Sequence, residues 1–157
     1  EIKTGMASFR GVDRRFDFKI KTDKVVYLSD YAHHPEEIKQ SILSMRALYG
    51  DKKLTGIFQP HLYTRTRDFY QEFAESLSLL DEVILTDIYP ARELPIEGVS
   101  SQLIYDNLRP DIDKILCTKE EVIDILKKKE IEVLMTLGAG DIENYAPQIC
   151  EILNERC

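Results

Sequence analysis

VVYLSDYAHHPEEIKQSILSMRAL, residues 25–48, decides the fold, because a short apolar run gives way directly to a pattern with helical periodicity. The run VVYL at 25–28 is rich in β-branched and aromatic residues, which is typical of a buried strand. Pro35 then opens a helix, since proline is tolerated in a first helical turn. The apolar residues that follow at helical spacing form one face: Ile38, Ile42, Met45 and Leu48.

Four further apolar runs predict strands, at 54–58, 83–88, 114–117 and 132–137. The runs are continuous rather than alternating, as in strands that are buried on both faces, and such strands are usually parallel. Strands that alternate with helices in this way predict an α/β fold with a doubly wound, mostly parallel, Rossmann-like sheet.

Helices are predicted between these strands. The second begins at Thr66 or Asp68, the third runs from the N-cap candidates Ser100–Ser101 to about Asn107, and the fourth covers 119–129. A last helix follows GAGD at 138–141. The residues expected on the buried faces of the second and last helices are Phe69, Phe73, Leu77, Leu80, Ile142, Tyr145, Ile149 and Ile152.

Residues 1–22 differ from the rest, because RRFDFKIK at 14–21 alternates polar and apolar residues with period two. Phe16, Phe18 and Ile20 are expected to share one face of a strand. Two interpretations stay open for this segment, an antiparallel edge strand and the tail of a preceding domain. The main domain is expected over 23–157. The start without Met indicates a fragment of a longer chain.

Composition and charge argue against several classes of function. The chain has 157 residues, 43% hydrophobic and 31% charged, which is typical of one globular domain. A net charge of −7 argues against a broad nucleic-acid or anionic-membrane surface. No apolar run approaches the roughly 20 residues of a spanning helix. Three widely spaced cysteines, Cys117, Cys150 and Cys157, favour reduced thiols in the cytoplasm over a disulfide framework.

All three histidines lie in loops that directly follow predicted strands. His33 and His34 belong to SDYAHHP after the first strand, and His61 belongs to QPHLYTRTR after the second. Ligands of open parallel sheets bind beyond the carboxyl ends of the strands, so both loops are expected at one functional edge. The loops YPARELPIEG and GAGD follow two other strands and reach the same edge.

Arginines in these loops indicate an anion site. Arg65 and Arg67 lie in a first helical turn, where the helix dipole favours acids, so their presence makes sense if they bind a carboxylate or phosphate. The alternative is a surface ion pair with Asp68 or Glu72. GAGD lacks the third glycine of a dinucleotide fingerprint, but backbone N–H groups at a helix N-terminus suit an anion.

Metal binding has little support in the sequence. Adjacent histidines such as His33 and His34 rarely chelate one ion together, and no cysteine completes a set, so no resident metal is expected. Asp30 and Asp87 are candidates to place a magnesium ion, a ribose or an amine. Their alternative role is to satisfy nearby loop N–H groups.

Four stretches resemble the carboxyl-terminal domain of the Mur ligases. They are DYAHHPEEI at 30–38, FQPHLYTRTRDF at 58–69, DIYPARELPIEGVSS at 87–101 and LGAGDI at 137–142. FRGVDRRF at 9–16 looks like the end of the family's central domain. The match runs in order from about residue 9 to about residue 145, which makes it far more specific than one glycine signature.

The resemblance implies an enzyme that uses ATP and Mg2+. The family phosphorylates the lactyl carboxylate of a UDP-linked sugar, and an amine then attacks the acyl phosphate. The match is to members that join L-alanine to UDP-N-acetylmuramate in peptidoglycan synthesis. The alternatives are the ligase that recycles whole peptides on the same sugar and a non-catalytic doubly wound binding domain. The ATP-binding loop and the sugar site lie on two earlier domains of such a chain, so the fragment alone is expected to be inactive.

The resemblance also implies roles for particular residues. His61 and Arg65 belong on the side of the alanine carboxylate, His33 on the side of the acyl phosphate, and Asp30 and Tyr31 near the nucleotide. Further substrate-binding candidates are His34, Tyr63, Arg67, Arg92, Gly138 and Gly140.

Two positions depart from the family pattern. Ser29 stands where the family often has an acid, and Leu62 stands where many members have arginine. The carboxylate clamp therefore rests on Arg65 alone or borrows Arg67 or Arg92. Which histidine acts as the base stays open.

Overall fold

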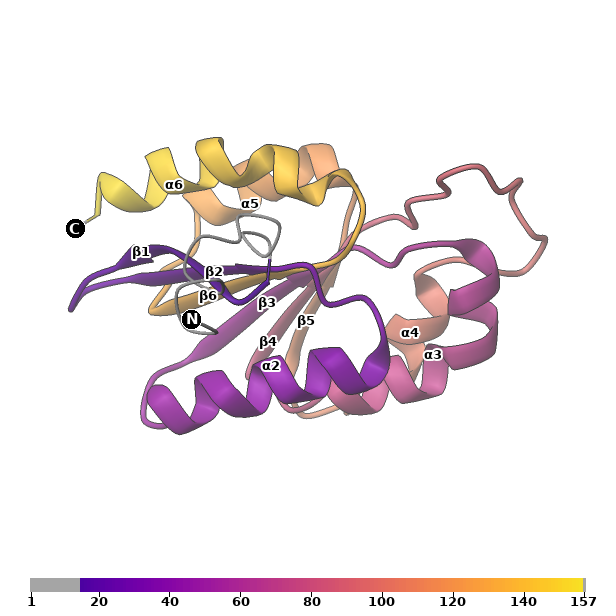
Figure 1. Cartoon of the computed structure of the whole chain (residues 1–157), viewed down its shortest axis with the longest axis horizontal. Coiled ribbons are helices and arrows are strands. Elements are labelled where there is room, and N and C mark those ends of the chain that lie inside the picture. Colours follow the sequence, from indigo (N-terminus) through magenta and orange to yellow (C-terminus); the bar gives the residue numbers. More distant parts are fainter. Residues whose placement is uncertain (1–14, 157) are drawn as a thin grey trace, which may run out of the picture.

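The computed structural model describes residues 15–156 (Figure 1). The expectations for residues 9–14 and for Cys157 lie outside this range. The described residues form one six-stranded sheet, in which the first strand is antiparallel to its neighbour and all other pairs are parallel. This confirms the predicted doubly wound sheet with an antiparallel edge strand. In spatial order the strands are β1 (Asp17–Lys21), β2 (Val26–Asp30), β6 (Val133–Leu137), β3 (Leu54–Phe58), β4 (Glu82–Leu85) and β5 (Asp113–Leu116).

The helices cover both faces of the sheet (Figure 1). One face carries α2 (Pro35–Leu48), α3 (Tyr63–Leu77) and α4 (Gln102–Asn107). The other carries α5 (Val122–Lys127) and α6 (Ala146–Asn154), which follow the 3-10 turns Lys119–Glu121 and Asp141–Tyr145. The first three crossovers carry the chain toward β5, and the return through α5 inserts β6 between β2 and β3. This reversal creates the topological switch point at which doubly wound sheets bind ligands.

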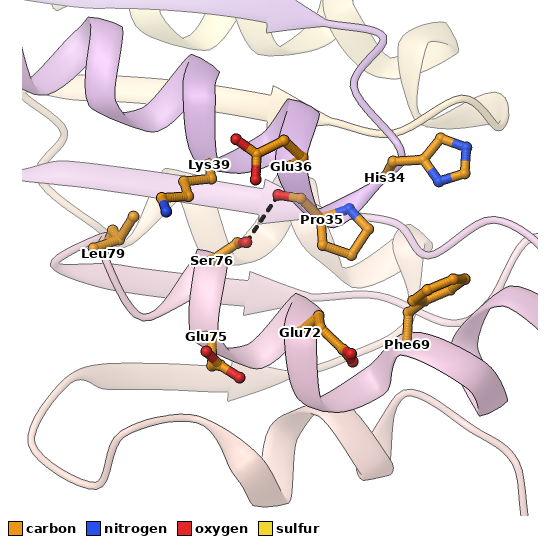
Figure 2. Close-up of a pocket in the computed structure, with 9 residues that line it drawn as sticks. All are labelled: His34, Pro35, Glu36, Lys39, Phe69, Glu72, Glu75, Ser76 and Leu79. Carbon is orange, nitrogen blue, oxygen red and sulfur yellow. Dashed lines mark hydrogen bonds between the residues drawn. The ribbon is translucent and has the colours of Figure 1, made fainter.

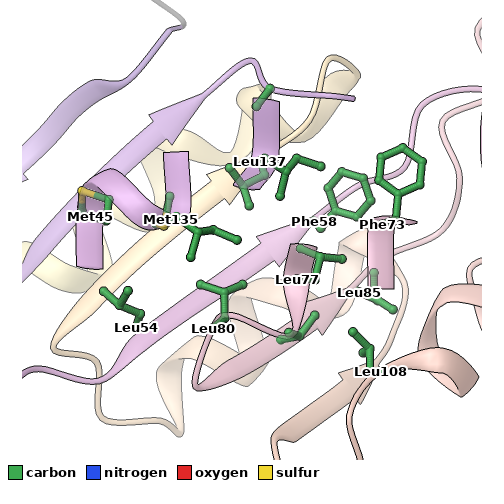
Figure 3. Close-up of a cluster of buried hydrophobic side chains, with 14 of the residues drawn as sticks. Met45, Leu54, Phe58, Phe73, Leu77, Leu80, Leu85, Leu108, Met135 and Leu137 are labelled. Carbon is green, nitrogen blue, oxygen red and sulfur yellow. The ribbon is translucent and has the colours of Figure 1, made fainter. Parts of the chain in front are cut away.

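The centre of the sheet accounts for the continuous apolar runs in the sequence. Every residue of β2, β3, β4 and β6 is buried, whereas β5, the last strand in the order, is only partly buried. Figure 3 shows the cluster on the side of α2 and α3, where the rings of Phe58 and Phe73 lie 5.2 Å apart.

Several details of the helices differ from the prediction. Helix α3 begins at Tyr63 rather than at Thr66 or Asp68, because a carboxylate distant in sequence binds its first N–H groups. Its buried face includes Thr66, Phe73 and Leu77, so Phe69 lies at the border of that face and is 40% exposed. Leu80 is buried as expected, although it lies beyond the helix end.

In the first and last helices, some residues near the helix ends also differ in burial from the prediction. Leu48, the last residue of α2, is exposed rather than buried. The buried positions are Ile142 in the 3-10 turn and Ala146, Ile149 and Leu153 in α6, at successive spacings of four, three and four residues. Leu153 therefore takes the inward place expected for Ile152, and Tyr145 is only partly buried.

Strand β1 does not keep one apolar face. Phe16 and Phe18 pack on the side of α2, whereas Ile20 packs on the side of α6. The register with β2 shifts between Phe18 and Ile20, and such an irregularity sends the following side chains to the opposite face. Within residues 15–156, no helix is both long and apolar enough to cross a membrane.

Phe73→Ala is expected to lower the free energy of unfolding by about 3–5 kcal/mol, because Phe73 is fully buried and truncation leaves a cavity. Phe69→Ala on the same helix is the control and should cost less than about 1 kcal/mol. Urea denaturation of the two variants and the parent chain measures both values. Equal losses in the two variants would contradict the assigned face of α3.

Candidate functional site

The carboxyl ends of β2, β3 and β6 bring all three histidines to one place. The ring centroids of His33 and His34 lie 4.9 Å apart, and those of His33 and His61 lie 6.1 Å apart. The two loops therefore share one edge of the sheet, as the topology predicted.

His61 is held between an aromatic ring and a guanidinium. Its ring stacks on Tyr89 with a centroid distance of 5.7 Å and an interplanar angle of 14°. Arg65, in the first turn of α3, places Nη1 3.0 Å from His61 Nδ1. Burial and the nearby charge of Arg65 lower the pKa of His61. The pair thus presents a neutral imidazole beside a fixed cation.

His33 is held by the loop that follows β2. Its Nδ1 lies 3.0 Å from the Tyr31 carbonyl oxygen, and the Tyr31 ring meets it edge-on at 5.3 Å. The backbone N–H groups of His33 and His34 both donate to Oε1 of Glu37, at 3.1 and 3.2 Å. Burial works against ionisation, but these two donors hold the pKa of Glu37 below its usual range.

His34 is exposed and also lines a groove between α2 and α3 (Figure 2). The groove has a volume of about 600 Å3, and Phe69 lines its other side. Ser76 donates to the Pro35 carbonyl oxygen at 2.8 Å and ties the two helices together. Burial and the charge of Arg65 lower the pKa of His34. Of the predicted site residues, only His34 lines this groove.

Asp30 ends β2 and is almost fully buried. Its carboxylate accepts hydrogen bonds from Ala32 N at 3.1 Å and from the Ser41 hydroxyl, and Arg15 Nε lies 3.6 Å away. These contacts match the alternative role of satisfying loop N–H groups. Tyr31, the next residue, is half-buried.

The two predicted glycines permit close packing of three loops. Gly138 has φ of +142°, and a Cβ there would lie 2.8 Å from the Gln59 carbonyl oxygen. A Cβ on Gly140 would lie 2.6 Å from Cγ of Tyr89. The buried Gln59 side chain donates to Asp141 Oδ1 at 2.7 Å and accepts from Ile142 N at 3.0 Å. Gln59 therefore joins the loop after β3 to the turn after β6.

Glu93 binds the beginning of α3 from a loop 30 residues away. Its Oε1 accepts from the backbone N–H groups of Tyr63 and Thr64 at 2.6 and 3.1 Å, and its Oε2 accepts from the Thr64 hydroxyl. The Thr64 hydroxyl, more than the two backbone donors, lowers the pKa of Glu93. The N-cap residue Leu62 has φ of +75°, a conformation that L-residues rarely adopt, and its N–H donates to the Tyr89 carbonyl oxygen at 2.9 Å.

The remaining candidates are Arg67, Arg92 and Tyr63. Arg67 is exposed and pairs with Asp68 at 2.9 Å, which is the alternative foreseen for it. Arg92 is exposed, and Tyr63 is half-buried. Across residues 15–156, no group of three or more His, Cys, Asp and Glu side chains is arranged to hold a metal ion.

Three residues that shape the site carried no local signal in the sequence. Gln59, Tyr89 and Glu93 act on partners in other loops, through a buried amide, a stacked ring and a remote cap. The nearest available signal was that all three stand in the stretches that resemble the Mur ligases.

Comparison with known proteins places the chain in a family. The family model for the Mur ligase, glutamate ligase domain, matches residues 14–142. The chain belongs to the Mur ligase family. A UDP-N-acetylmuramate–L-alanine ligase of Phocaeicola vulgatus is 79% identical over 156 residues, which cover 99% of this chain and 34% of that protein.

Solved structures agree with this membership. The UDP-N-acetylmuramate–alanine ligase of Thermotoga maritima matches with a TM-score of 0.74 at 27% identity, over 95% of this chain and 32% of that one. A murein peptide ligase of Psychrobacter arcticus matches with a TM-score of 0.72 at 17% identity, over 96% of this chain and 32% of its own. The latter likeness shows the fold alone. This Mur ligase chain spans only 34% of the length of the Phocaeicola relative.

Glu93→Ala is expected to lower the melting temperature at pH 7, because α3 loses the acceptor for two backbone N–H groups. The lowered pKa of Glu93 means that the cap stabilises above the unfolded-state value near 4.5 and is lost as pH falls through the folded-state value. The gap in melting temperature between parent and variant should therefore close in acid. Glu97→Ala, an exposed residue of the same loop, is the control. A gap that persists unchanged below pH 3 would be incompatible with the cap.

Proposed function

We propose that this chain is the carboxyl-terminal domain of an ATP-dependent ligase that joins L-alanine to UDP-N-acetylmuramate through an acyl phosphate. The identity of 79% with such a ligase across 99% of the chain supports this substrate pair over the peptide-recycling alternative. The observation that carries the chemistry is the contact of His61 Nδ1 with Arg65 at the carboxyl edge of the sheet. We place the reaction in the cytoplasm, as part of peptidoglycan precursor synthesis.

Arg65 is the proposed anchor for the carboxylate of L-alanine. Arg65 is half-buried, so a charge-assisted bond to a carboxylate is less screened there than at a fully exposed position. Arg67 already pairs with Asp68, and Arg92 stands exposed in its loop, so each contributes less than Arg65 in this scheme. The Arg65 guanidinium is also held by its hydrogen bond to Nδ1 of His61. Orienting the carboxylate fixes where the amine of the amino acid lies.

His33 lies on the side of the acyl phosphate in this proposal. An acyl phosphate hydrolyses when water reaches it, so a domain that closes over the reacting groups protects the intermediate. We assign Asp30 and Tyr31 to the nucleotide side. The remaining contacts to substrate are assigned to His34, Tyr63, Gly138 and Gly140.

ATP and magnesium belong to the proposed reaction but mainly to other parts of the enzyme. Mg2+ would neutralise charge on the transferred phosphoryl group. Since the described part of the chain has no cluster of acids or histidines suited to the ion, we place its ligands on the preceding domains. The boundary of those domains within residues 1–22 is part of the same proposal.

Arg65→Ala in the complete ligase should lower kcat/KM for L-alanine by about 100-fold, the value of one strong charge-assisted contact. Its melting temperature should match that of the parent enzyme, because Arg65 is half-buried and hydrogen-bonds to the ring and carbonyl oxygen of His61, four residues earlier in the chain. Arg67→Ala is the matched control and should lose less than 10-fold. Phosphate release at varied L-alanine measures both. Similar losses in the two variants would argue against Arg65 as the anchor.

ADP release with L-alanine, L-alanyl peptides and no amine tests the reaction itself. The complete ligase should turn over with UDP-N-acetylmuramate, ATP and L-alanine, and the 157-residue chain alone should release no ADP. Turnover with peptides alone would assign the enzyme to peptide recycling. Turnover by the isolated chain would refute the placement of the ATP site on other domains.

A further inference from the structure

The two histidines that face each other across the site are held in opposite tautomers. His61 Nδ1 lies 3.0 Å from Nη1 of Arg65, and a guanidinium only donates hydrogen bonds. Nδ1 of His61 is therefore the acceptor, and the ring proton of the neutral imidazole is on Nε2. In this tautomer, the second nitrogen of His61 is a hydrogen-bond donor.

His33 has the reverse arrangement. Its Nδ1 lies 3.0 Å from the Tyr31 carbonyl oxygen, which only accepts hydrogen bonds. Nδ1 of His33 therefore carries the proton, and Nε2 carries the free lone pair. The Glu37 carboxylate, 3.6 Å from the same Nδ1, favours this tautomer as well. Its side chain keeps 20% exposure, so a substrate can reach the ring.

We propose that His33 is the general base that deprotonates the incoming amine, and that His61 is a neutral donor that binds substrate. This inference rests on the proposed ligase function and decides which of the two histidines carries the proton. Both assignments follow from the partners of Nδ1, and neither requires a rearrangement of the rings.

The charges around each ring support the same division. A proton taken up by His33 would lie beside Glu37, so the imidazolium gains a counter-charge. A proton taken up by His61 would lie against Arg65 and displace its hydrogen bond. The groups around His33 are Tyr31, His34, Glu37 and His61, and Arg15 lies 3.8 Å from Glu37. The groups around His61 are His33, Arg65, Tyr89 and Glu93.

The reaction balances with one base. The ammonium of L-alanine transfers a proton to Nε2 of His33, and the lone pair that remains forms the C–N bond at the acyl carbon. The C–O bond to phosphate breaks with its electron pair on the leaving phosphate. The second nitrogen proton leaves as the amide forms and is taken up by that phosphate, and His33 returns its proton to water.

His33→Gln and His61→Gln in the complete ligase test the assignment. A glutamine amide both donates and accepts but takes up no proton near pH 7. His33→Gln should lower kcat/KM for L-alanine by about 100-fold or more and remove the acidic limb of the pH profile. His61→Gln should raise KM for L-alanine and keep that limb. Loss of the limb in His61→Gln, or its retention in His33→Gln, would overturn the assignment.

Hydroxylamine as the attacking amine distinguishes loss of the base from general damage to the site in His33→Gln. It is already neutral at pH 7 and needs no deprotonation. Hydroxamate formation by His33→Gln should stay within about 3-fold of the parent, and imidazole should restore L-alanine turnover to His33→Ala. Equal losses with both amines and no rescue would overturn the base role. A parent enzyme without L-alanine-dependent ADP release would instead overturn the proposed function.

Discussion

Parallel pairing of β6 with both β2 and β3 is the constraint on which the site depends. Leu137 at the end of β6 is in register with Asp30 on one side and Phe58 on the other. The three strands therefore end at the same height, and their loops leave the sheet as neighbours. The ladder continues one step further, since Gly138 N donates to the Asp30 carbonyl and Gln59 N donates to the Leu137 carbonyl. His33 and His61, whose rings lie 6.1 Å apart, belong to two of these neighbouring loops.

Contacts between the loops then fix the positions of the site residues that follow these neighbouring strand ends. The Tyr89 ring stacks on His61, and the Tyr89 carbonyl oxygen accepts a hydrogen bond from the N–H of Leu62. One residue of the loop after β4 therefore contacts both the His61 ring and the backbone of the next residue. Glu93, four residues later, caps α3 at Tyr63 and Thr64, the two residues that precede Arg65. Preorganisation of this kind lets a clamp act without first paying the entropy of ordering its side chains.

The sequence predicted what depends on local periodicity and chain order. The five parallel strands, the edge strand and the edge that gathers the histidines all follow from apolar runs and from the loops after them. The start of α3 did not follow, because its cap comes from Glu93, far outside any local window. The split of Phe18 and Ile20 between two faces depends on a shift of register, which leaves no mark in a period-two pattern. The partners of the histidine rings likewise belong to tertiary structure.

Leu62 departs from the family pattern and also has an unusual backbone conformation. An L-residue at φ of +75° is strained, at a cost of order 1–3 kcal/mol, and the fold must compensate for it. The compensation is visible in the backbone, because the Leu62 carbonyl oxygen accepts from Thr66 N at 3.2 Å and from the Thr66 hydroxyl at 3.0 Å. An arginine here, as the resemblance leads one to expect, would in the proposed scheme share the carboxylate of L-alanine with Arg65. In the proposed scheme, leucine in its place leaves the orientation of the substrate to Arg65, whose guanidinium lies 3.0 Å from Nδ1 of His61.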